Sequence, residues 1–253
     1  MTQWYTGNIV RIEDASPTTK RFWLEVEDME RFDFKAGQFI TMDLPIGERR
    51  NQRWRSYSIA NAPPSGSSVG VTLSHADTTN TIELCIVHLD DGLASGWLFN
   101  EAKIGTAIKF KGPDGTFTLP DSIENELVLI CTGTGVAPFR SMIWEIFNNK
   151  IPHRGIHLIF GTRTADGILY QAEFEALAQK MPGLRYSVAL SREEREGCHH
   201  GYVHDIYQKD YAKKCPDVTF YLCGWTKMVD EAVANLIVKM GYERGQVKYE
   251  LYG

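Results

Sequence analysis

The hydrophobic pattern of this chain changes character near Leu119–Asp121, and that change constrains the fold more than any other feature. Before it, short runs rich in Val, Ile, Thr and aromatic residues are separated by turn residues, which is typical of β-strands. After it, apolar strands alternate with helical segments. Because 253 residues accommodate two domains of ordinary size, we expect a first domain over 1–120 and a second over 121–253.

The first half predicts a closed antiparallel β-barrel, because many evenly spaced strands without helical periodicity are typical of that architecture. The expected strands are Trp4–Glu13, Lys20–Glu27, Gln38–Leu44, Arg55–Ala60, Val69–Ser74, Thr81–His88 and Ala107–Lys111.

The second half predicts an α/β domain with a parallel sheet covered on both faces, because strands that alternate with helices form crossover units. The expected strands are Glu126–Cys131, Ile156–Phe160, Arg185–Leu190, Thr219–Cys223 and Gln246–Leu251, and the expected helices are Val136–Phe147, Glu173–Lys180, Val203–Tyr211 and Met228–Met240.

Composition and charge narrow the class of protein. Hydrophobic residues make up 43% of the chain and the net charge is −5, which indicates a globular protein and argues against nucleic acid as a partner. No stretch approaches the ~20 apolar residues of a membrane helix, and the first residues lack the pattern of a secretory signal. The five cysteines form no close Cys-x-x-Cys pair, so we expect free thiols in a reducing cytoplasm, no iron–sulfur cluster and no metal site.

The segment Arg55-Ser56-Tyr57-Ser58 lies on an expected barrel strand. Strand alternation puts Arg55 and Tyr57 on one side and Ser56 and Ser58 on the other. The fork of an arginine suits a pyrophosphate, and a tyrosine beside it offers a flat surface to an aromatic ring. An ordinary strand with an exposed arginine explains the same residues equally well.

The turn from Gly92 to Ser95 is a weaker candidate for phosphate binding. A glycine lets the backbone approach a phosphate closely, and a serine near a helix start helps to supply donors. A plain glycine turn with a serine cap is the commoner explanation. The later segment Gly112–Phe117 reads as a structural turn.

Two glycine motifs end strands of the expected parallel sheet. Gly133-Thr134-Gly135-Val136-Ala137-Pro138 lies between a buried strand and a helix, which is where dinucleotide loops occur, although Pro138 takes the third glycine position of the usual fingerprint. Cys223-Gly224 ends another strand at the same edge. A buried cysteine is usually a small hydrophobe, so core packing stays open beside a role in a cofactor cleft.

Taken in order, the motifs RxYS, GxxS, GPxGxF, GTGxAPF, CG and a final E-x-Y resemble the ferredoxin–NADP reductase family. The resemblance covers essentially the whole chain, and the ordered set is far more specific than any single motif. It implies an FAD-binding barrel, an NAD(P)-binding α/β domain, and hydride transfer between nicotinamide and flavin.

The resemblance also implies roles for individual residues. Arg55 and Ser95 would hold the FAD pyrophosphate, Tyr57 would pack on one flavin face, and Ser58 would bond near the flavin N5. The Gly133–Gly135 loop would receive the dinucleotide pyrophosphate. The residues expected to bind FAD are Arg55, Tyr57, Ser58, Gly92, Ser95 and Tyr252, and those expected to bind NADP are Gly133, Thr134, Gly135, Pro138, Arg163, Ser191, Arg192, Tyr202, Cys223 and Gly224.

Four of the implied residues form the catalytic set. Cys223 would stand beside the nicotinamide C4, and Glu250 would complete the hydride site with Ser58 and help to route a proton. Tyr252 would cover the second flavin face until nicotinamide displaces it. The plant-type branch of the family ends at this tyrosine, whereas Gly253 follows it here.

The residues expected near the adenosine ribose favour NADPH over NADH. Ser191 and Arg192 follow a strand, and in the plant-type family a Ser-Arg pair followed by a lysine and a tyrosine binds the 2′-phosphate. Tyr202 matches that tyrosine, His200 stands where the lysine would be, and Arg163 adds a charge. NADH stays open, because the acidic residues Glu193, Glu194 and Glu196 crowd the same loop.

The leading functional hypothesis is electron exchange between NADP(H) and a separate one-electron carrier such as ferredoxin or flavodoxin. The basic, aromatic group Arg49, Arg50, Arg53 and Trp54 predicts a docking site for such an acidic carrier, with a solvated loop as the alternative. A second hypothesis is the NADH-dependent reductase component of an oxygenase or another multi-component system. A third, a flavin-binding regulatory subunit, would not need Ser58, Cys223 and Glu250.

Overall fold

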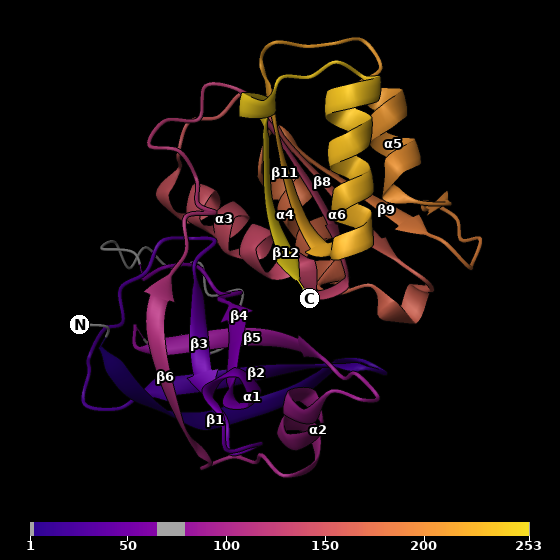
Figure 1. Cartoon of the computed structure of the whole chain (residues 1–253). Helices are drawn as coiled ribbons and strands as arrows, with labels where there is room; N and C mark the ends of the chain where they lie inside the picture. The colour runs from indigo at the N-terminus through magenta and orange to yellow at the C-terminus, as the bar shows by residue number, and fades with distance from the viewer. Residues whose placement is uncertain (1–2, 65–78, 253) are drawn as a thin grey trace. The chain divides into compact units, whose positions relative to one another are not determined.

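The computed structural model describes residues 3–64 and 79–252, and the chain divides into two compact units (Figure 1). The first, the barrel unit, comprises Met1–Thr118 and Arg140–Asn149, and the second, the sheet unit, comprises Leu119–Phe139 and Lys150–Gly253. The expected fold class, an antiparallel β-domain followed by a parallel α/β domain, is confirmed. The strand expected over 69–74 lies outside the described residues.

Over its described residues, the barrel unit is a six-stranded antiparallel sheet that closes on itself. Its strands are β1 (Trp4–Ser16), β2 (Thr19–Val26), β3 (Phe39–Asp43), β4 (Trp54–Ser58), β5 (Thr81–Val87) and β6 (Ala107–Asp114), in the order β4-β3-β6-β1-β2-β5. A bridge between Ile59 and Leu84 joins the segment after β4 to β5, and the Ala60 N–H donates to the Glu83 carbonyl at 2.8 Å. These contacts link the two outer strands and close the barrel.

In the part of the barrel unit that the structure describes, the helices α1 (Arg50–Arg53) and α2 (Leu93–Asn100) interrupt the strands. The strand-rich pattern did not predict them as elements. The turn that leads into α2 is held locally, because the Leu89 N–H donates to the Ser95 hydroxyl at 3.0 Å and that hydroxyl lies 3.1 Å from the Gly92 carbonyl oxygen. Side-chain bonds to the backbone of this kind leave little trace in a hydrophobic pattern.

The sheet unit is a parallel sheet whose chain order reverses at its centre. Its strands are β7 (Glu126–Thr132), β8 (Ile156–Thr162), β9 (Leu184–Leu190), β10 (His199–His200), β11 (Val218–Trp225) and β12 (Val247–Tyr252), in the order β10-β9-β8-β7-β11-β12. The chain moves outward from β7 to β10 and then returns to the other side of β7. Ligands of such sheets bind at the carboxyl ends of the strands where this reversal occurs.

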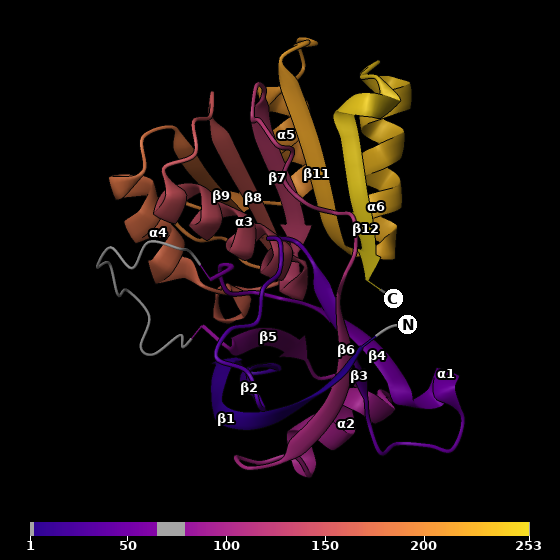
Figure 2. The same cartoon turned by 90° about the vertical axis from the view of Figure 1, so that its left-hand side faces the viewer.

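Helices cover both faces of this sheet. The helices that begin in the sheet unit are α3 (Val136–Asn149), α4 (Gln171–Lys180), α5 (Val203–Asp210) and α6 (Thr226–Val233), together with the short turns η1 (Gly133–Gly135), η2 (Ala165–Gly167) and η4 (Arg244–Gln246). Figure 2 shows α5 and α6 on one face of the sheet and α4 on the other. None of the described helices is long and apolar enough to cross a membrane.

The helix expected over Met228–Met240 is divided. The α-helix ends at Val233 and continues as a π-helix, η3 (Ala234–Lys239), in which the Met240 N–H donates to the Asn235 carbonyl at 2.9 Å. The Asn235 side chain is buried and donates to the Tyr207 hydroxyl of α5 at 3.0 Å. A buried polar side chain that must reach a partner on the next helix accounts for the wider turn, and the apolar spacing alone does not reveal it.

A buried polar network joins the amino-terminal ends of three strands of the sheet unit. His157 of β8 is fully buried, with Nδ1 at 3.1 Å from the Tyr211 hydroxyl and Nε2 at 2.9 Å from the Ser187 hydroxyl. The Tyr211 hydroxyl donates to Glu126, and Arg185 lies 2.8 Å from the His157 ring. Burial, together with the Arg185 charge, lowers the pKa of His157 to about 3.

This network predicts a loss of stability in acid. The folded protein keeps His157 neutral down to about pH 3, whereas the unfolded chain takes up a proton below the ordinary histidine pKa of 6.5. The unfolded state therefore binds more protons between these two values, so stability falls as the pH falls from about 6.5 to 3, by up to about 1.4 kcal/mol per pH unit for one full proton.

We expect His157→Gln to reduce stability at neutral pH and to flatten this acid slope, measured as the urea midpoint of unfolding across the pH range. His200→Gln is the control, because it removes an exposed histidine. An unchanged slope in the His157 variant would mean that other groups account for the acid sensitivity.

Candidate active site

The Gly133–Gly135 loop lies at the carboxyl edge of the parallel sheet, between β7 and α3, where the strand order reverses. Gly133 has a φ of +53°, and no atom lies within 4 Å of the position that a Cβ would take there. The first N–H groups of a helix lack intrahelical partners. An open glycine turn that leads into such groups fits the pyrophosphate of a dinucleotide.

Gly135 holds this loop against the end of the neighbouring strand. A Cβ on Gly135 would stand 2.7 Å from the Gly224 Cα and closer still to the Cys223 carbonyl oxygen. Gly224 in turn has a φ of +135°, and a Cβ there would stand 2.5 Å from the Thr132 hydroxyl oxygen. The two glycines therefore allow the ends of β7 and β11 to meet with backbone in contact.

Thr132 is a site residue that the sequence did not single out. Its hydroxyl accepts a hydrogen bond from the Trp225 N–H at 3.3 Å, which ties the end of β7 to the end of β11. The signal available in the sequence was its place between a buried strand and the glycine loop.

Cys223, Glu250 and Tyr252 come together in the sheet unit. Cys223 is paired in register with Glu250, and Trp225 with Tyr252. The pKa of the Cys223 thiol is raised well above its usual value, first by burial and second by the Glu250 carboxylate, while the neighbouring Tyr252 acts in the opposite direction. The thiol therefore stays protonated at neutral pH, which does not suit a nucleophile.

The residues expected at the ribose end lie at the same edge, two strands away from β7. The Arg192 N–H donates to the Arg163 carbonyl at 2.9 Å, and the Ser191 N–H donates to the Thr162 carbonyl at 3.1 Å. His200 of β10 is paired in register with Leu190 of β9, and Tyr202 and Arg192 each follow two residues later. The side chains of Arg163, Arg192 and Tyr202 are all exposed.

Two residues near the expected ribose site, Glu193 and His200, are held by hydrogen bonds with neighbouring backbone groups. The Glu193 carboxylate accepts the Ala165 N–H at 2.7 Å, so this acidic group caps a turn and its charge is partly compensated. His200 directs Nδ1 to the Glu193 carbonyl at 3.1 Å. Glu194 and Glu196 are exposed to solvent.

Three of the expected flavin residues, Arg55, Tyr57 and Ser58, lie on β4 of the barrel unit. Arg55 Nη1 donates to the Asn51 and Trp54 carbonyls at 3.0 and 2.8 Å, and its Nε and Nη2 groups donate to no described residue. Burial raises the pKa of Tyr57 to about 12 against the opposing charge of Arg55, so the ring stays neutral. Ser58 is buried and Ser56 is exposed. Open donors beside a neutral aromatic ring fit a flavin dinucleotide.

The Ser95 hydroxyl is engaged within its own turn, with Leu89 and Gly92. A Cβ on Gly92 would stand 2.5 Å from this hydroxyl, so the glycine serves close packing inside the turn. The first N–H groups of α2 are further donors at this turn, and the role of Ser95 in holding the FAD pyrophosphate stays a prediction.

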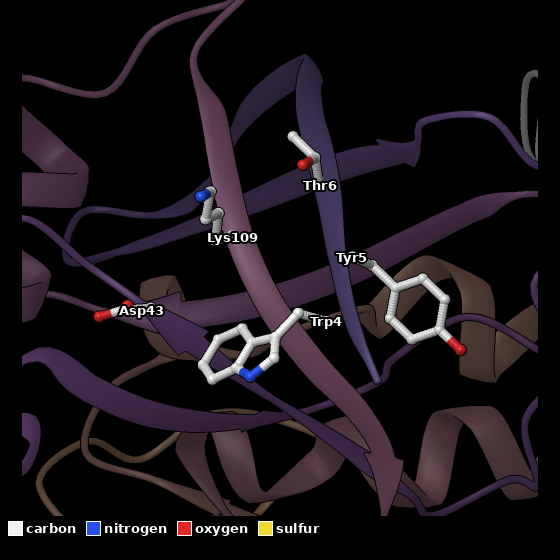
Figure 3. A pocket seen from close by; sticks show the side chains of 5 residues that line it. All are labelled: Trp4, Tyr5, Thr6, Asp43 and Lys109. Atoms are coloured by element: carbon white, nitrogen blue, oxygen red, sulfur yellow. The ribbon is translucent and has the colours of Figure 1, made fainter. Parts of the chain in front are cut away.

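A separate pocket of about 430 Å³ lies on the outside of the barrel unit, lined by Trp4, Tyr5, Thr6, Asp43 and Lys109 (Figure 3). Trp4 and Tyr5 extend to opposite sides of β1. None of the expected FAD residues lines it.

Aromatic and basic side chains gather beside this pocket. The Trp4 ring meets the Trp54 ring edge-on at 5.3 Å, and Arg50 and Lys111 lie over Trp54 at 4.6 and 4.3 Å. We call Trp4, Trp54, Arg50, Lys109 and Lys111 the Trp54 surface. Of the basic group expected around Trp54, Arg53 is engaged in an ion pair with Asp43 at 2.5 Å.

Comparison with known protein families assigns each unit. Residues 6–119 match the oxidoreductase FAD-binding domain family, and residues 129–234 match the oxidoreductase NAD-binding domain family. The chain therefore carries domains that bind FAD and NAD(P)H.

Individual relatives point to two kinds of reductase. The chain is 30% identical to the phenol 2-monooxygenase reductase component DmpP of Pseudomonas sp. (strain CF600), over 95% of this chain and 63% of that protein. It is 28% identical to ferredoxin–NADP reductase B of Sorangium cellulosum, over 98% of this chain and 97% of that protein. The crystal structure of the cytochrome P450 reductase GcoB from Amycolatopsis has a TM-score of 0.82 and 26% identity, over 98% of this chain and 69% of that one.

The length covered differs among these relatives. The chain spans 64% and 63% of the first two curated relatives that it matches, both from phenol-hydroxylating systems by name.

The contact between Gly135 and β11 predicts the effect of one added methyl group. Gly135→Ala would push the loop away from Cys223 and Gly224, so we expect a loss of about 1–3 kcal/mol in stability and at least a tenfold rise in KM for the nicotinamide coenzyme. FAD content should be unchanged, because the barrel residues are untouched.

Gly245→Ala is the matched control, because no atom lies within 4 Å of the Cβ position there. Steady-state kinetics and thermal unfolding of both variants check the expectation. Wild-type KM in a folded Gly135→Ala protein would mean that the loop does not bind the coenzyme.

Proposed function

Because the chain belongs to the ferredoxin–NADP reductase-like oxidoreductases, with an FAD-binding domain followed by an NAD-binding domain, we propose that it oxidises NADPH and passes single electrons to a separate acidic carrier such as ferredoxin or flavodoxin. The coarser activity, NAD(P)H-dependent flavin reduction, follows from the family. The observation that carries the proposal is the meeting of the Gly133–Gly135 loop, Cys223 and Glu250 at one edge of the sheet unit.

On this proposal, the residues of β4 hold FAD. Arg55 would bind the pyrophosphate with its open donors, together with the first N–H groups of α2. Tyr57 would pack on the flavin ring, and Ser58 would lie near N5. FAD, when bound, accepts two electrons as hydride and can release them singly.

The residues of the sheet unit would orient the nicotinamide. Gly133, Thr134 and Gly135 would bind the pyrophosphate, with Pro138 in the first turn of α3. The Cys223 thiol would bound the space next to C4, and the Glu250 carboxylate would hold or move a proton. Tyr252 would occupy the nicotinamide position until the coenzyme arrives. Such positioning acts by bringing the reacting atoms to ~3–3.5 Å.

The purified protein tests this reaction directly. We expect the released cofactor to be FAD and not FMN, and NADPH without oxygen to bleach the flavin absorbance. Cys223→Ser should keep FAD but slow bleaching by clearly more than about twofold, because near-attack geometry is sensitive to small displacements. Cys215→Ser, a change at a half-buried cysteine elsewhere in the sheet unit, is the control. FMN in the extract, or no bleaching, would contradict the proposed function.

The coenzyme on this proposal is NADPH. Arg163 and Arg192 lie on adjacent backbone segments, and the Glu193 carboxylate is engaged by a backbone N–H, which weakens the argument for NADH. Arg192 and Ser191 would bind the 2′-phosphate, and Tyr202 would lie against the adenosine.

Arg192→Ala should therefore raise KM for NADPH about 10- to 100-fold, as expected for a lost charge-assisted hydrogen bond, and leave KM for NADH nearly unchanged. Arg195→Ala, in the same loop and also exposed, is the control. Steady-state kinetics with both coenzymes measure the effect. Preference of the unaltered enzyme for NADH would overturn the assignment.

The Trp54 surface supports an acidic protein as the electron acceptor. It holds three cations and two aromatic rings, on a chain whose net charge is −5. Trp54 directly precedes Arg55, so this surface adjoins the proposed flavin strand in the chain. Opposite charge would speed the encounter and weaken with added salt.

We expect charge reversal of Arg49 and Arg50 to lower kcat/KM for an acidic ferredoxin or flavodoxin several-fold at low ionic strength. The rate with a small dye should stay unchanged, and the difference should fade at high salt. Lys103→Glu reverses an exposed charge elsewhere in the barrel unit and is the control. A rate of carrier reduction that changes neither with salt nor with the charge reversal would rule out docking at this surface.

The second candidate function is that of a reductase component of an oxygenase. The 30% identity with DmpP favours it. The two functions share the NAD(P)H reaction and differ in the acceptor. The partner that binds the unaltered protein, but not the protein with a charge-reversed Trp54 surface, therefore distinguishes them by its identity.

A further inference from the structure

A buried carboxylate lies between two arginines in the barrel unit. Glu83 of β5 is 1% exposed; its Oε1 accepts Arg21 Nε at 2.6 Å and its Oε2 accepts Arg140 Nη1 at 2.8 Å. The Arg140 side chain is 2% exposed, although it comes from α3. Arg21 also lies 3.6 Å from Glu13 at the more exposed end of the row. Two cations and one anion in such surroundings are costly to bury and need good hydrogen-bond geometry.

The hydrogen bonds of this group converge on the segment that follows Ser58. Arg140 Nη1 donates to the Ala60 carbonyl at 2.9 Å, and the Ala60 N–H donates to the Glu83 carbonyl at 2.8 Å. The Glu83 N–H donates to the Asn61 side chain, also at 2.8 Å. Glu83 and Arg140 thus hold two consecutive residues that lie just beyond Ser58.

Helix α3 is fixed in the barrel unit at further points. Glu145 lies beside Lys35 and Ala36 of the barrel unit, and burial raises the pKa of its carboxyl. A Cβ on Gly37 would meet Met142 of the same helix at 2.5 Å. Arg140 is therefore held on a helix that cannot shift easily, which makes it a firm support for Ala60.

A buried ion pair is weak evidence for a role in stability, because apolar residues of similar size often replace one without loss. The placement of this group suggests another role. We propose that Arg140 and Glu83 are positioning residues for flavin reduction, which fix the end of β4 so that the Ser58 hydroxyl keeps its orientation toward the flavin. The inference rests on the proposed function, since it takes Ser58 as a flavin contact.

The experiment measures the folded holoprotein with saturating NADPH. Arg140→Met should keep FAD yet lower the limiting rate of flavin reduction at least tenfold, with little change in the NADPH concentration at half-maximal rate. The visible spectrum of the bound flavin should shift, because the hydrogen bond from Ser58 is altered. Arg31→Met, which breaks an exposed ion pair with Asp33 in the same unit, is the control.

Two further variants keep the inference testable if Arg140→Met folds poorly. Arg140→Lys retains the charge and should recover part of the rate, and Glu83→Gln retains the shape and an acceptor and should slow the reaction less than Arg140→Met does. The Glu83→Gln/Arg140→Met double variant should be no slower than Arg140→Met alone if the two act as one unit.

A purely structural role predicts a different result. The variants would unfold at lower temperature, yet their folded holoproteins would reduce flavin at the wild-type rate with the wild-type spectrum, and that outcome would overturn the inference. Failure of the wild-type protein to bleach with NADPH would instead refute the proposed function.

Discussion

The contact between the ends of β7 and β11 is the constraint on which the sheet unit depends. These two strands flank the reversal of chain order, and backbone meets backbone there because Gly135 and Gly224 carry no Cβ. Thr132 adds a hydrogen bond across the same point. A side chain at either glycine would separate the strands and displace the loop that leads into α3. The same contact that holds the centre of the sheet together therefore also forms the edge at which sheets of this topology bind their ligands.

Both units bury charged or titratable groups, and they do so for different physical reasons. The His157 network lies at the amino-terminal ends of the strands, opposite the edge that carries the Gly133–Gly135 loop. Its donors and acceptors pair with one another inside the sheet unit. The Glu83–Arg140 pair lies beside the strand that carries Arg55, Tyr57 and Ser58. A buried network such as that of His157 stabilises a domain. A buried pair such as Glu83–Arg140 instead orients particular side chains.

Much of the fold could be predicted from the sequence, because each half of the chain keeps one repeating hydrophobic pattern. Alternation over the first half and strand–helix alternation over the second predicted most strands to within a few residues. The reading missed what local patterns do not encode. Helix α2 depends on hydrogen bonds of Ser95, and the π-helix η3 depends on the hydrogen bond from the Asn235 side chain to Tyr207. Residues 140–149 read as part of an α/β unit, yet they group with the barrel through contacts with residues far away in the chain.

The candidate site could be predicted in part, for a related reason. Gly133, Cys223 and Arg192 each lie at or just beyond the carboxyl end of a strand, and parallel strands bring these ends to one edge without further information. No such rule links Glu83 with Arg140, or Trp4 with Trp54, because these pairs depend on how the barrel closes. The Ser95 motif had the right residue in the right turn, and only the structure reveals that its hydroxyl is engaged with the backbone.

The spacing along the sheet edge separates coenzyme choice from chemistry. Ser191 and Arg192 follow β9, whereas Cys223 lies near the end of β11, three strands farther along the edge. At ~4.8 Å per strand this is roughly 14 Å, so a charge at Arg192 has little direct effect on the atoms near Cys223 through water and salt. Burial keeps the Cys223 thiol protonated, so this side chain carries no charge at neutral pH. On the proposed assignment, substitutions at Ser191 or Arg192, just after β9, would therefore change the selectivity between NADPH and NADH while the geometry at Cys223 and Glu250 stays as it is.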